Sequence, residues 1–219
     1  MKTLTVSEAI SAVRKNLDEL GLNESIMYTD ESTDNTSLDG VIARTLPEAI
    51  NQVHLAAPVA WLEGVDYSKG PFDKITFSDG ILDFSFSADF LRLVEFQAKD
   101  SPIVVTDVLD EASAEGRKQL NKYIRGRYDR PRLVRVQGQH GKPEFLYYTL
   151  KDEQHKTYPA GAIKRFFFVK EQFFSESATG YQISTDLRQN ILDGLTAMVL
   201  AIYGENEKAK YFADKASIK

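Results

Sequence analysis

Apolar residues recur at helical spacing near the start of the chain. After Thr5 they return every three or four positions as far as Leu20, which is the pattern of an amphipathic helix. Thr5 and Glu8 have the spacing of a capping box, in which each side chain accepts a hydrogen bond from the backbone N–H of the other residue. Gly21 can adopt the left-handed conformation that often ends a helix. A first helix is therefore predicted between Thr5 and Gly21.

A second helix is predicted after a polar stretch. Residues 23–40 are acidic and rich in Asn, Asp, Ser and Thr, which predicts a long loop. Residues 45–48 (TLPE) repeat the signal for a helix start, with proline early in the helix, where its missing N–H is not needed. Pro58 is expected to stop this helix. Residues 1–64 are thus predicted to be mainly helical.

The pattern changes to that of β-strands from Phe72 onward. The sequence ITFSDGILDFSFS places Asp79-Gly80 between two runs of β-branched and aromatic residues, which is a strong signal for a hairpin. Residues 91–96 alternate in polarity as a further strand, and Pro102 precedes a short apolar run. Residues 72–105 are therefore predicted to form a hairpin followed by strands.

The next segment carries its acids early and its bases late. This order of charge suits the dipole of a helix, so a helix is predicted at residues 107–126, with Gly126 at its end. Strands are predicted again within residues 131–170, where polarity alternates in three runs, at 132–136, 144–150 and 163–169.

Helical spacing returns in the last part of the chain. Thr185 can cap a helix with an apolar stripe, Gly204 is expected to end that helix, and a short charged helix follows. A helical C-terminus is therefore predicted at residues 185–217. The complete order predicts an α+β fold, with helices at both ends and mostly antiparallel strands between them, in a single subunit of residues 1–219.

The composition is that of an ordinary globular protein, with 42% hydrophobic and 27% charged residues. No apolar run approaches the roughly 20 residues needed to cross a bilayer, so no membrane partner is expected, and the polar, acidic N-terminus does not have the pattern of a secretory signal. Cysteine is absent, which excludes disulfides and cysteine metal sites and fits a reducing compartment. The formal net charge of -5 argues against a protein that coats nucleic acid over its whole surface.

One short run nevertheless concentrates positive charge in this acidic chain. Between residues 117 and 135 only Asp129 opposes the basic side chains. The basic residues are Arg117, Lys118, Lys122, Arg125, Arg127, Arg130, Arg132 and Arg135.

Three interpretations of this basic run remain open from the residues alone. It could be the solvated end of a helix followed by a strand. It could contact phosphates, since Tyr123 and Tyr128 lie between the cations and could stack on bases. It could also meet an acidic segment of a neighbouring subunit, such as residues 30–39 or 107–115, through complementary charge.

Signals for catalysis or cofactor binding are weak. His54, His140 and His155 have no metal-ligand spacing, and neither a glycine-rich phosphate loop nor a serine-nucleophile motif is present, so neither a metal nor a cofactor is expected. Asp107 and Asp110 could divide acid and base roles in a hydrolase. We instead expect these two acids to open the helix that follows them, and no enzymatic activity is predicted.

Other polar and aromatic residues are expected to have structural roles. Asp83 and Asp89 flank a strand and are predicted to be turn or cap residues. The pair Tyr147-Tyr148 could stack on bases. Together with the phenylalanines at 166–168 and 173–174, however, it is expected to fill a core and a subunit interface.

Four phrases spread over most of the chain suggest a family. They are TLPEAINQVHLAAPVAWLEG, SADFLRLVEFQAKD, QLNKYIRGRYDRPRLVRV and ILDGLTAMVLAIYGENEKAKYFADKA. Through them the chain resembles the head-to-tail connector proteins of tailed bacteriophages, the adaptor or ring proteins below the portal, and most closely those of crAss-like podoviruses. Asp89 to Leu93 and Asn121 to Gly126 match phrases of such connectors, whereas Ser87-Ala88 stand where their pattern has proline.

The resemblance implies a structural protein of the virion, assembled in the bacterial host cytoplasm and without a catalytic site. Such subunits form a closed ring, commonly of twelve copies, that binds the portal protein and the next connector or tail protein. The ring extends the channel for viral double-stranded DNA and helps to retain the packaged genome. The eight basic residues are then expected to line a subunit interface or the DNA channel. The alternative is a nucleic-acid-binding module that uses residues 117–135 independently of sequence.

Overall fold

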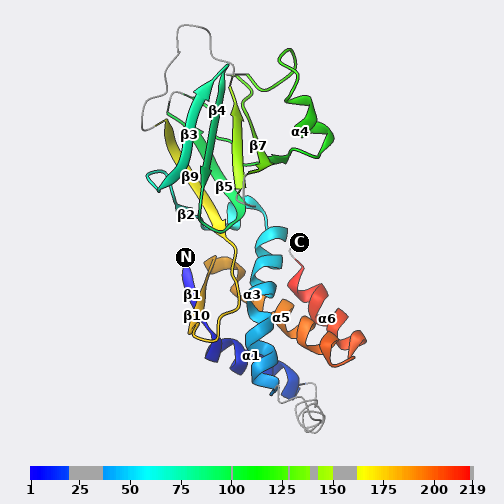
Figure 1. Cartoon of the computed structure of the whole chain (residues 1–219). Helices are drawn as coiled ribbons and strands as arrows, with labels where there is room; N and C mark the ends of the chain where they lie inside the picture. Colours follow the sequence, from blue (N-terminus) through cyan, green and yellow to red (C-terminus); the bar gives the residue numbers. More distant parts are fainter. Residues whose placement is uncertain (20–36, 100, 128, 139–142, 150–161, 218–219) are drawn as a thin grey trace. The chain divides into compact units, whose positions relative to one another are not determined.

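The computed structural model of the chain has helices toward both ends of the sequence and strands between them (Figure 1). Most strand pairs are antiparallel, which confirms the predicted α+β fold. The chain divides into two compact units: a helical unit, Met1–Glu63 with Glu171–Lys219, and a sheet unit, Gly64–Lys170. The structure describes residues 1–19, 37–99, 101–127, 129–138, 143–149 and 162–217.

Four α-helices form most of the described helical unit. Helix α3 packs against α1 and α5, and α6 packs against α5. A pair of antiparallel strands, β1 and β10, joins the two ends of this unit. The bounds are β1 (Lys2–Thr5), α1 (Val6–Glu19), α3 (Leu38–Ala56), the 3-10 turn η1 (Val59–Trp61), β10 (Gly180–Ile183), the 3-10 turn η4 (Thr185–Leu187), α5 (Arg188–Ile202) and α6 (Asn206–Ala216).

The start of α1 confirms the predicted capping box. The backbone N–H of Thr5 donates to Glu8 Oε2 at 3.0 Å, and the backbone N–H of Glu8 donates to Thr5 Oγ1 at 3.2 Å. Val13 and Leu17 then lie on the buried face of the helix. The local sequence therefore determines where this helix begins.

The predicted start of the second helix is wrong. Helix α3 begins at Leu38, where Ser37 Oγ accepts a hydrogen bond from the backbone N–H of Gly40 at 3.2 Å, so Pro47 lies inside the helix. The helix extends through this position because Leu38 and Ile42 are buried in the core and favour the helical conformation upstream of the proline. Most of the loop predicted at 23–40 falls outside the described residues.

The helices at the C-terminus broadly follow the prediction. Leu187, Ile191 and Leu195 are buried, and Gly204 has a φ of +83°, the left-handed conformation that ends α5. Thr185 does not cap α5, because the 3-10 turn η4 precedes this helix. Ile202, the last residue of α5, is exposed.

The sheet unit contains a five-stranded and a three-stranded sheet. The order of the first is β3-β4-β8-β7-β6 and that of the second is β2-β9-β5; only the β6–β7 pair is parallel among the described strands. The bounds are β2 (Val65–Asp66), β3 (Phe72–Ser78), β4 (Ile81–Phe86), β5 (Phe90–Ala98), β6 (Val108–Asp110), β7 (Arg132–Gln137), β8 (Pro143–Tyr148) and β9 (Ile163–Lys170).

Aromatic side chains from both sheets share one core. Phe86 of β4 lies 5.1 Å from Phe166 of β9, and Phe90 of β5 lies 4.9 Å from Phe145 of β8, measured between ring centroids. Tyr147 is also fully buried in this cluster. The core therefore holds the two sheets of this unit together.

The hairpin predicted at Asp79-Gly80 is confirmed. Asp79 has a φ of 51° and Gly80 a φ of 73°, so both central residues of the two-residue turn adopt positive φ. This is the geometry of the turns that match the twist of a hairpin, and Asp-Gly is one of the sequences that adopt it readily. The turn connects β3 to β4.

The helix predicted at 107–126 is wrong. Val108–Asp110 form the edge strand β6, which pairs with β7, and α4 spans only Ala114–Lys118 (Figure 1). A longer helix would have no core to cover, since Leu120 and Ile124 are exposed. The strand expected after Pro102 is reduced to a bridge between Val105 and Phe96.

Candidate interaction surface: a basic groove

The end of α4, the loop after it and the start of β7 surround a groove of about 440 Å³ on the sheet unit. The sequence brings its cations here through a turn and a strand start rather than along one helix. Five of the eight predicted basic residues line this groove: Lys118, Arg125, Arg127, Arg130 and Arg132. We call this feature the basic groove.

The other three predicted residues interact elsewhere. Arg117 donates to the carbonyl oxygen of Ala112 from Nε at 3.0 Å and from Nη2 at 2.8 Å, which closes the turn before α4. The Arg135 guanidinium lies 5.6 Å from the ring centroid of Phe90. Lys122 lies over the ring of Tyr123 at 5.5 Å. The basic run is therefore not one uniform surface.

A buried glutamine holds the loop of the basic groove in place. Gln119 Oε1 accepts a hydrogen bond from the backbone N–H of Gly126 at 2.7 Å, and Gln119 Nε2 donates to the carbonyl oxygen of Glu115 at 3.1 Å. Gly126 is closely packed, because a Cβ atom there would lie only 2.8 Å from the backbone nitrogen of Arg132. The loop is thus fixed by specific contacts at both of its ends.

Arg125 connects this loop to the neighbouring hairpin. Its Nη2 donates to the carbonyl oxygen of Asp79 at 2.6 Å, while its Nε is buried and has no hydrogen-bond partner among the residues that the structure describes. Beside it, burial raises the pKa of the Tyr148 hydroxyl, and the positive charge of Arg125 partly opposes this effect. Arg125 therefore ties the loop of the basic groove to the β3–β4 hairpin.

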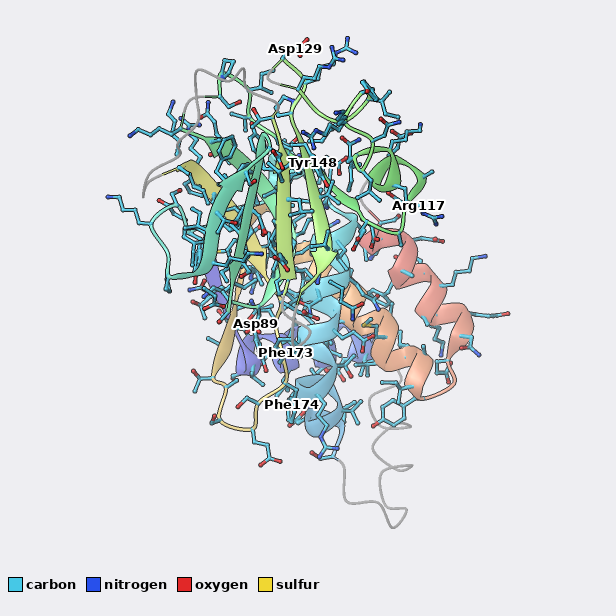
Figure 2. The ribbon with its side chains drawn as sticks, turned by 45° about the horizontal axis from the view of Figure 1, so that its top comes forward. Asp89, Arg117, Asp129, Tyr148, Phe173 and Phe174 are labelled. Carbon is cyan, nitrogen blue, oxygen red and sulfur yellow. The ribbon has the colours of Figure 1, made fainter. Side chains whose placement is uncertain are left out.

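A tight turn presents the outer cations of the groove. The backbone N–H of Arg127 donates to the carbonyl oxygen of Arg130 at 3.1 Å, and the reverse bond is 2.9 Å long. Asp129 lies at the tip of this turn, and Arg117, a residue of α4, lies apart from it (Figure 2). Tyr128, considered earlier as a stacking residue, lies outside the described residues.

Most of the positive charge in the groove is not neutralised by carboxylates of the described residues. Glu115 pairs with Lys118 at 2.5 Å, and the hydrogen bond from Lys118 lowers the pKa of the Glu115 carboxyl. Among the described residues, no carboxylate lies within ion-pair distance of the remaining cations of the groove, Arg125, Arg127, Arg130 and Arg132. The groove therefore presents an excess of positive charge.

Exposed apolar and aromatic side chains lie in the same loop as these cations, and Tyr123 and Ile124 line the groove itself. Leu120 is 68% exposed, Tyr123 is 74% exposed and Ile124 is 58% exposed. The exposure of Leu120 and Ile124 did not follow from the predicted helix, because an amphipathic helix would bury both residues on one face. A surface that combines arginine with exposed apolar and aromatic groups is typical of a protein interface rather than of a solvated face.

The remaining candidates for chemistry have structural roles. Burial lowers the pKa of His54 to about 4, and its Nε2 accepts a hydrogen bond from the backbone N–H of Ser184 at 3.2 Å. Asp110 does not open a helix, because it ends β6 and its Oδ1 accepts from the backbone N–H of Ala112 at 2.7 Å. His140 and His155 lie outside the described residues.

Neither a metal centre nor a membrane span is found in the part of the chain that the structure describes. There, no three His, Asp or Glu side chains come together in a group that could hold a metal ion. Within the same ranges, no helix has the length and apolar character that crossing a bilayer requires.

A salt-bridge cluster on the sheet unit was missed at the sequence level. Lys74 Nζ lies 2.5 Å from Asp83 Oδ2 and 2.6 Å from Glu144 Oε1, and so links β3, β4 and β8. Burial raises the pKa of the Asp83 carboxyl, whereas the hydrogen bond from Lys74 lowers that of Glu144. The prediction of Asp83 as a turn or cap residue is therefore wrong, because it lies within a strand, while Asp89 lies in the connection before β5.

The aromatic residues divide between core and surface. Phe166, Phe168 and the Tyr147-Tyr148 pair are buried, so this tyrosine pair cannot stack on bases. Phe173 and Phe174 are instead exposed on the helical unit, between β9 and β10 (Figure 2). The expectation that the aromatics fill a core is confirmed for the first set only.

Formal charge is also divided unevenly between the two units. The helical unit has nine Lys and Arg against 17 Asp and Glu, which gives -8, and the sheet unit has 18 against 15, which gives +3. The net charge of -5 for the whole chain is therefore the sum of an acidic helical unit and a basic sheet unit.

Comparison with known proteins identifies no family: no model of a protein family matches the chain, and no curated protein is significantly similar to it in sequence.

Proposed function

We propose that the protein is a structural subunit of the head-to-tail connector of a tailed bacteriophage. Copies of the chain form a closed ring between the portal and the tail, and this ring extends the DNA channel and docks the next connector or tail protein. The proposal rests on the resemblance of four phrases along the chain to such connectors and on the opposite formal charges of the two units.

The opposite charge of the two units is the observation that carries the proposal. A closed cyclic ring needs heterologous interfaces, in which each subunit presents two different and complementary surfaces. A unit with a formal charge of -8 and a unit of +3 within one chain meet this requirement. The positive surface of the sheet unit would be the basic groove, where five basic side chains lie together.

The proposed location is the virion, at the junction of head and tail. Twelve copies are expected from the resemblance, and the viral double-stranded DNA would make only passing contact with the channel wall. An acidic chain suits such a wall, because DNA must slide along it rather than bind.

The test is cryo-EM of virions from the phage that encodes the chain. A ring of copies directly below the portal is the expected result. The chain would be identified in the cryo-EM map by fitting its helical unit and its sheet unit into the density. Absence of the chain from the virion, or its location in the capsid shell or the tail fibres, would overturn the proposal.

The alternative function is sequence-independent binding of nucleic acid. The basic groove favours it, because four arginines there have no carboxylate partner among the described residues. It predicts an affinity for duplex DNA that falls steeply with salt and weakens when Arg127, Arg130 and Arg132 are changed to Ala. DNA binding that is absent, or unaffected by these changes, would exclude it.

A further inference from the structure

A short exposed segment of the helical unit combines aromatic and acidic side chains. Residues 171–177 (EQFFSES), which we call the aromatic–acidic segment, follow β9 in the sequence. Phe173 is 57% exposed and Phe174 is 42% exposed, and both are labelled in Figure 2. Glu171 and Glu176 flank them. Two adjacent exposed phenylalanines are costly in water unless a partner covers them.

The aromatic–acidic segment is held in a defined conformation. Asn51 of α3 donates from Nδ2 to the carbonyl oxygen of Gln172 at 2.9 Å, and it accepts from the backbone N–H of Gln172 at 2.9 Å. The Arg44 guanidinium lies 6.0 Å from the ring centroid of Phe174. A segment fixed in this way loses little conformational entropy when it binds.

The chemistry of the basic groove is complementary to that of this segment. The groove offers arginines without a carboxylate partner among the described residues, and exposed Tyr123 and Ile124 lie among them. The segment offers two carboxylates and two exposed phenyl rings. Arginine can pair with a carboxylate and also stack on an aromatic ring, so the two surfaces match in both charge and apolar character.

We propose that the aromatic–acidic segment of one copy of the chain docks into the basic groove of a second copy. The inference rests on the proposed ring, for which it names the two surfaces of the repeating contact. One surface belongs to the helical unit and the other to the sheet unit. The contact is therefore heterologous, and it can be repeated from copy to copy around a ring.

A second copy fits the groove better than a phosphate backbone does. Phosphates would not cover Tyr123 or Ile124, which are exposed and line the groove together with the cations. The second copy, in contrast, carries exposed phenylalanines for the apolar part and glutamates for the arginines.

Two charge-reversal variants test the contact. The groove variant carries R127E and R130E, and the segment variant carries E171K and E176K. Sedimentation velocity at low salt measures the self-association of each protein. We expect wild-type protein to self-associate, and each variant alone to bind its own copies at least about tenfold more weakly, because like charges then face each other.

A mixture of the two variants tests the pairing of the two surfaces more specifically than either variant alone. In the mixture, the acidic groove of one variant meets the basic segment of the other, while the second pair of surfaces is unchanged. Assembly should therefore return in the mixture, with the two variants in equal amounts. A third variant with F173A and F174A keeps every charge and should also weaken self-association, because it removes the apolar part of the contact.

Matched controls separate this contact from a general effect of charge. K69E with K164E changes the charge of the sheet unit as the groove variant does, and D18K with D214K changes that of the helical unit as the segment variant does. All four residues are exposed and lie outside both surfaces. These controls should associate like the wild type, and circular dichroism should show that every variant is folded.

Several results would overturn the inference. They are a wild-type protein that stays monomeric, variants that associate normally, and a mixture of the two variants that does not assemble. Loss of DNA binding in the groove variant, without any self-association of the wild type, would assign the groove to nucleic acid instead. A virion that shows the ring with a different subunit contact would overturn this inference alone and leave the proposed function standing.

Discussion

At His54, the packing of the helical unit determines the protonation of one side chain. The residue is fully buried in α3, and its Nε2 accepts a hydrogen bond from the backbone N–H of Ser184. An imidazole that accepts at Nε2 cannot carry a proton there, and burial lowers the pKa of His54 to about 4. Folding is therefore coupled to the loss of a proton from His54 in mildly acidic solution.

The stability of the protein should fall as the pH decreases from 6.5 to about 4. Above pH 6.5 His54 is neutral in both the folded and the unfolded chain, so its contribution is complete. Between these values the unfolded chain takes up a proton that the folded chain does not, which destabilises the fold by about 3 kcal/mol at the lower limit. Urea unfolding at a series of pH values measures this loss.

His54→Gln is the matched variant for this prediction. Its amide oxygen can still accept from Ser184, but it does not titrate, so the free energy of unfolding should depend less on pH between 6.5 and 5 than in the wild type. Equal slopes in the two proteins would contradict the assignment.

The shape of the basic groove depends on the absence of a side chain at Gly126. A Cβ atom there would lie 2.8 Å from two backbone atoms, the nitrogen of Arg132 and the carbonyl oxygen of Tyr148. Backbone atoms cannot move aside as a flexible side chain can, so Gly126→Ala should destabilise the protein by about 1–3 kcal/mol.

Gly194→Ala is the control for the change at Gly126. In α5 the added methyl group would lie 3.6 Å from Val53 Cγ2, an ordinary contact, and alanine favours a helix over glycine by up to about 1 kcal/mol. Thermal unfolding should therefore show a lower Tm for Gly126→Ala and an equal or higher Tm for Gly194→Ala. A Gly126→Ala protein as stable as the wild type would show that the loop is not closely packed.

At the scale of elements, the start of α1 is determined by two side chains. Thr5 and Glu8 each accept from the backbone N–H of the other residue, so two of the N–H groups left unpaired at this helix end are satisfied. The same residues lie where β1 passes directly into α1. The capping box thus also defines the junction of a strand and a helix.

Thr5→Ala should lower the free energy of unfolding by about 1 kcal/mol, since it removes the side-chain acceptor for the N–H of Glu8. Glu8→Gln should cost less, because glutamine can serve at this position of the box. Chemical denaturation compares the three proteins. A larger loss for Glu8→Gln than for Thr5→Ala would show that the charge of Glu8, rather than its hydrogen bond, is the important term.

Elements with strong local signals were predicted well. The capping box of α1 and the Asp79-Gly80 turn depend on residues that contact one another within a few positions, so the sequence is sufficient to find them. The start of α3 was missed because the burial of Leu38 and Ile42 extends the helix beyond the local signal at residues 45–48. Burial is a property of the tertiary fold and is not visible in a local pattern.

The basic groove could be predicted only in part, for the same reason. The sequence identifies the cations, but the choice of the five that line the groove depends on the bond between Gln119 and Gly126 and on the turn from Arg127 to Arg130. The helix expected at 107–126 would have distributed them differently. Charge order alone could not show that this helix has no core to cover.

At the scale of the whole molecule, opposite charges belong to different units. Attraction between the helical unit of one copy, formally -8, and the sheet unit of the next, formally +3, should guide the copies into the same orientation. Repulsion between like units would disfavour the reversed orientations. In the proposed ring, the charge distribution would therefore contribute to the orientation of the copies as well as to the strength of their association.

Association of the copies should weaken as salt is added. Electrostatic attraction between exposed groups extends over about 10 Å at 0.1 M salt and about 3 Å at 1 M. We therefore expect the apparent Kd to rise by about tenfold between 0.05 and 0.5 M NaCl, with the apolar part of the contact remaining. Sedimentation velocity measures the change. A Kd that is constant or decreases with salt would mean that charge does not guide assembly.

The sheet unit is an insertion within the sequence of the helical unit, and this order has a consequence for biosynthesis. Residues 64–170 emerge from the ribosome as one continuous stretch, whereas β1 must wait for its partner β10, almost 180 residues later. The sheet unit can therefore fold first, and the helical unit closes only after residues 171–217 have been synthesised. Exposed Phe173 and Phe174 belong to that last part, so a nascent chain that ends before them lacks one of the two proposed contact surfaces and, in the proposed ring, would not yet bind a second copy through it.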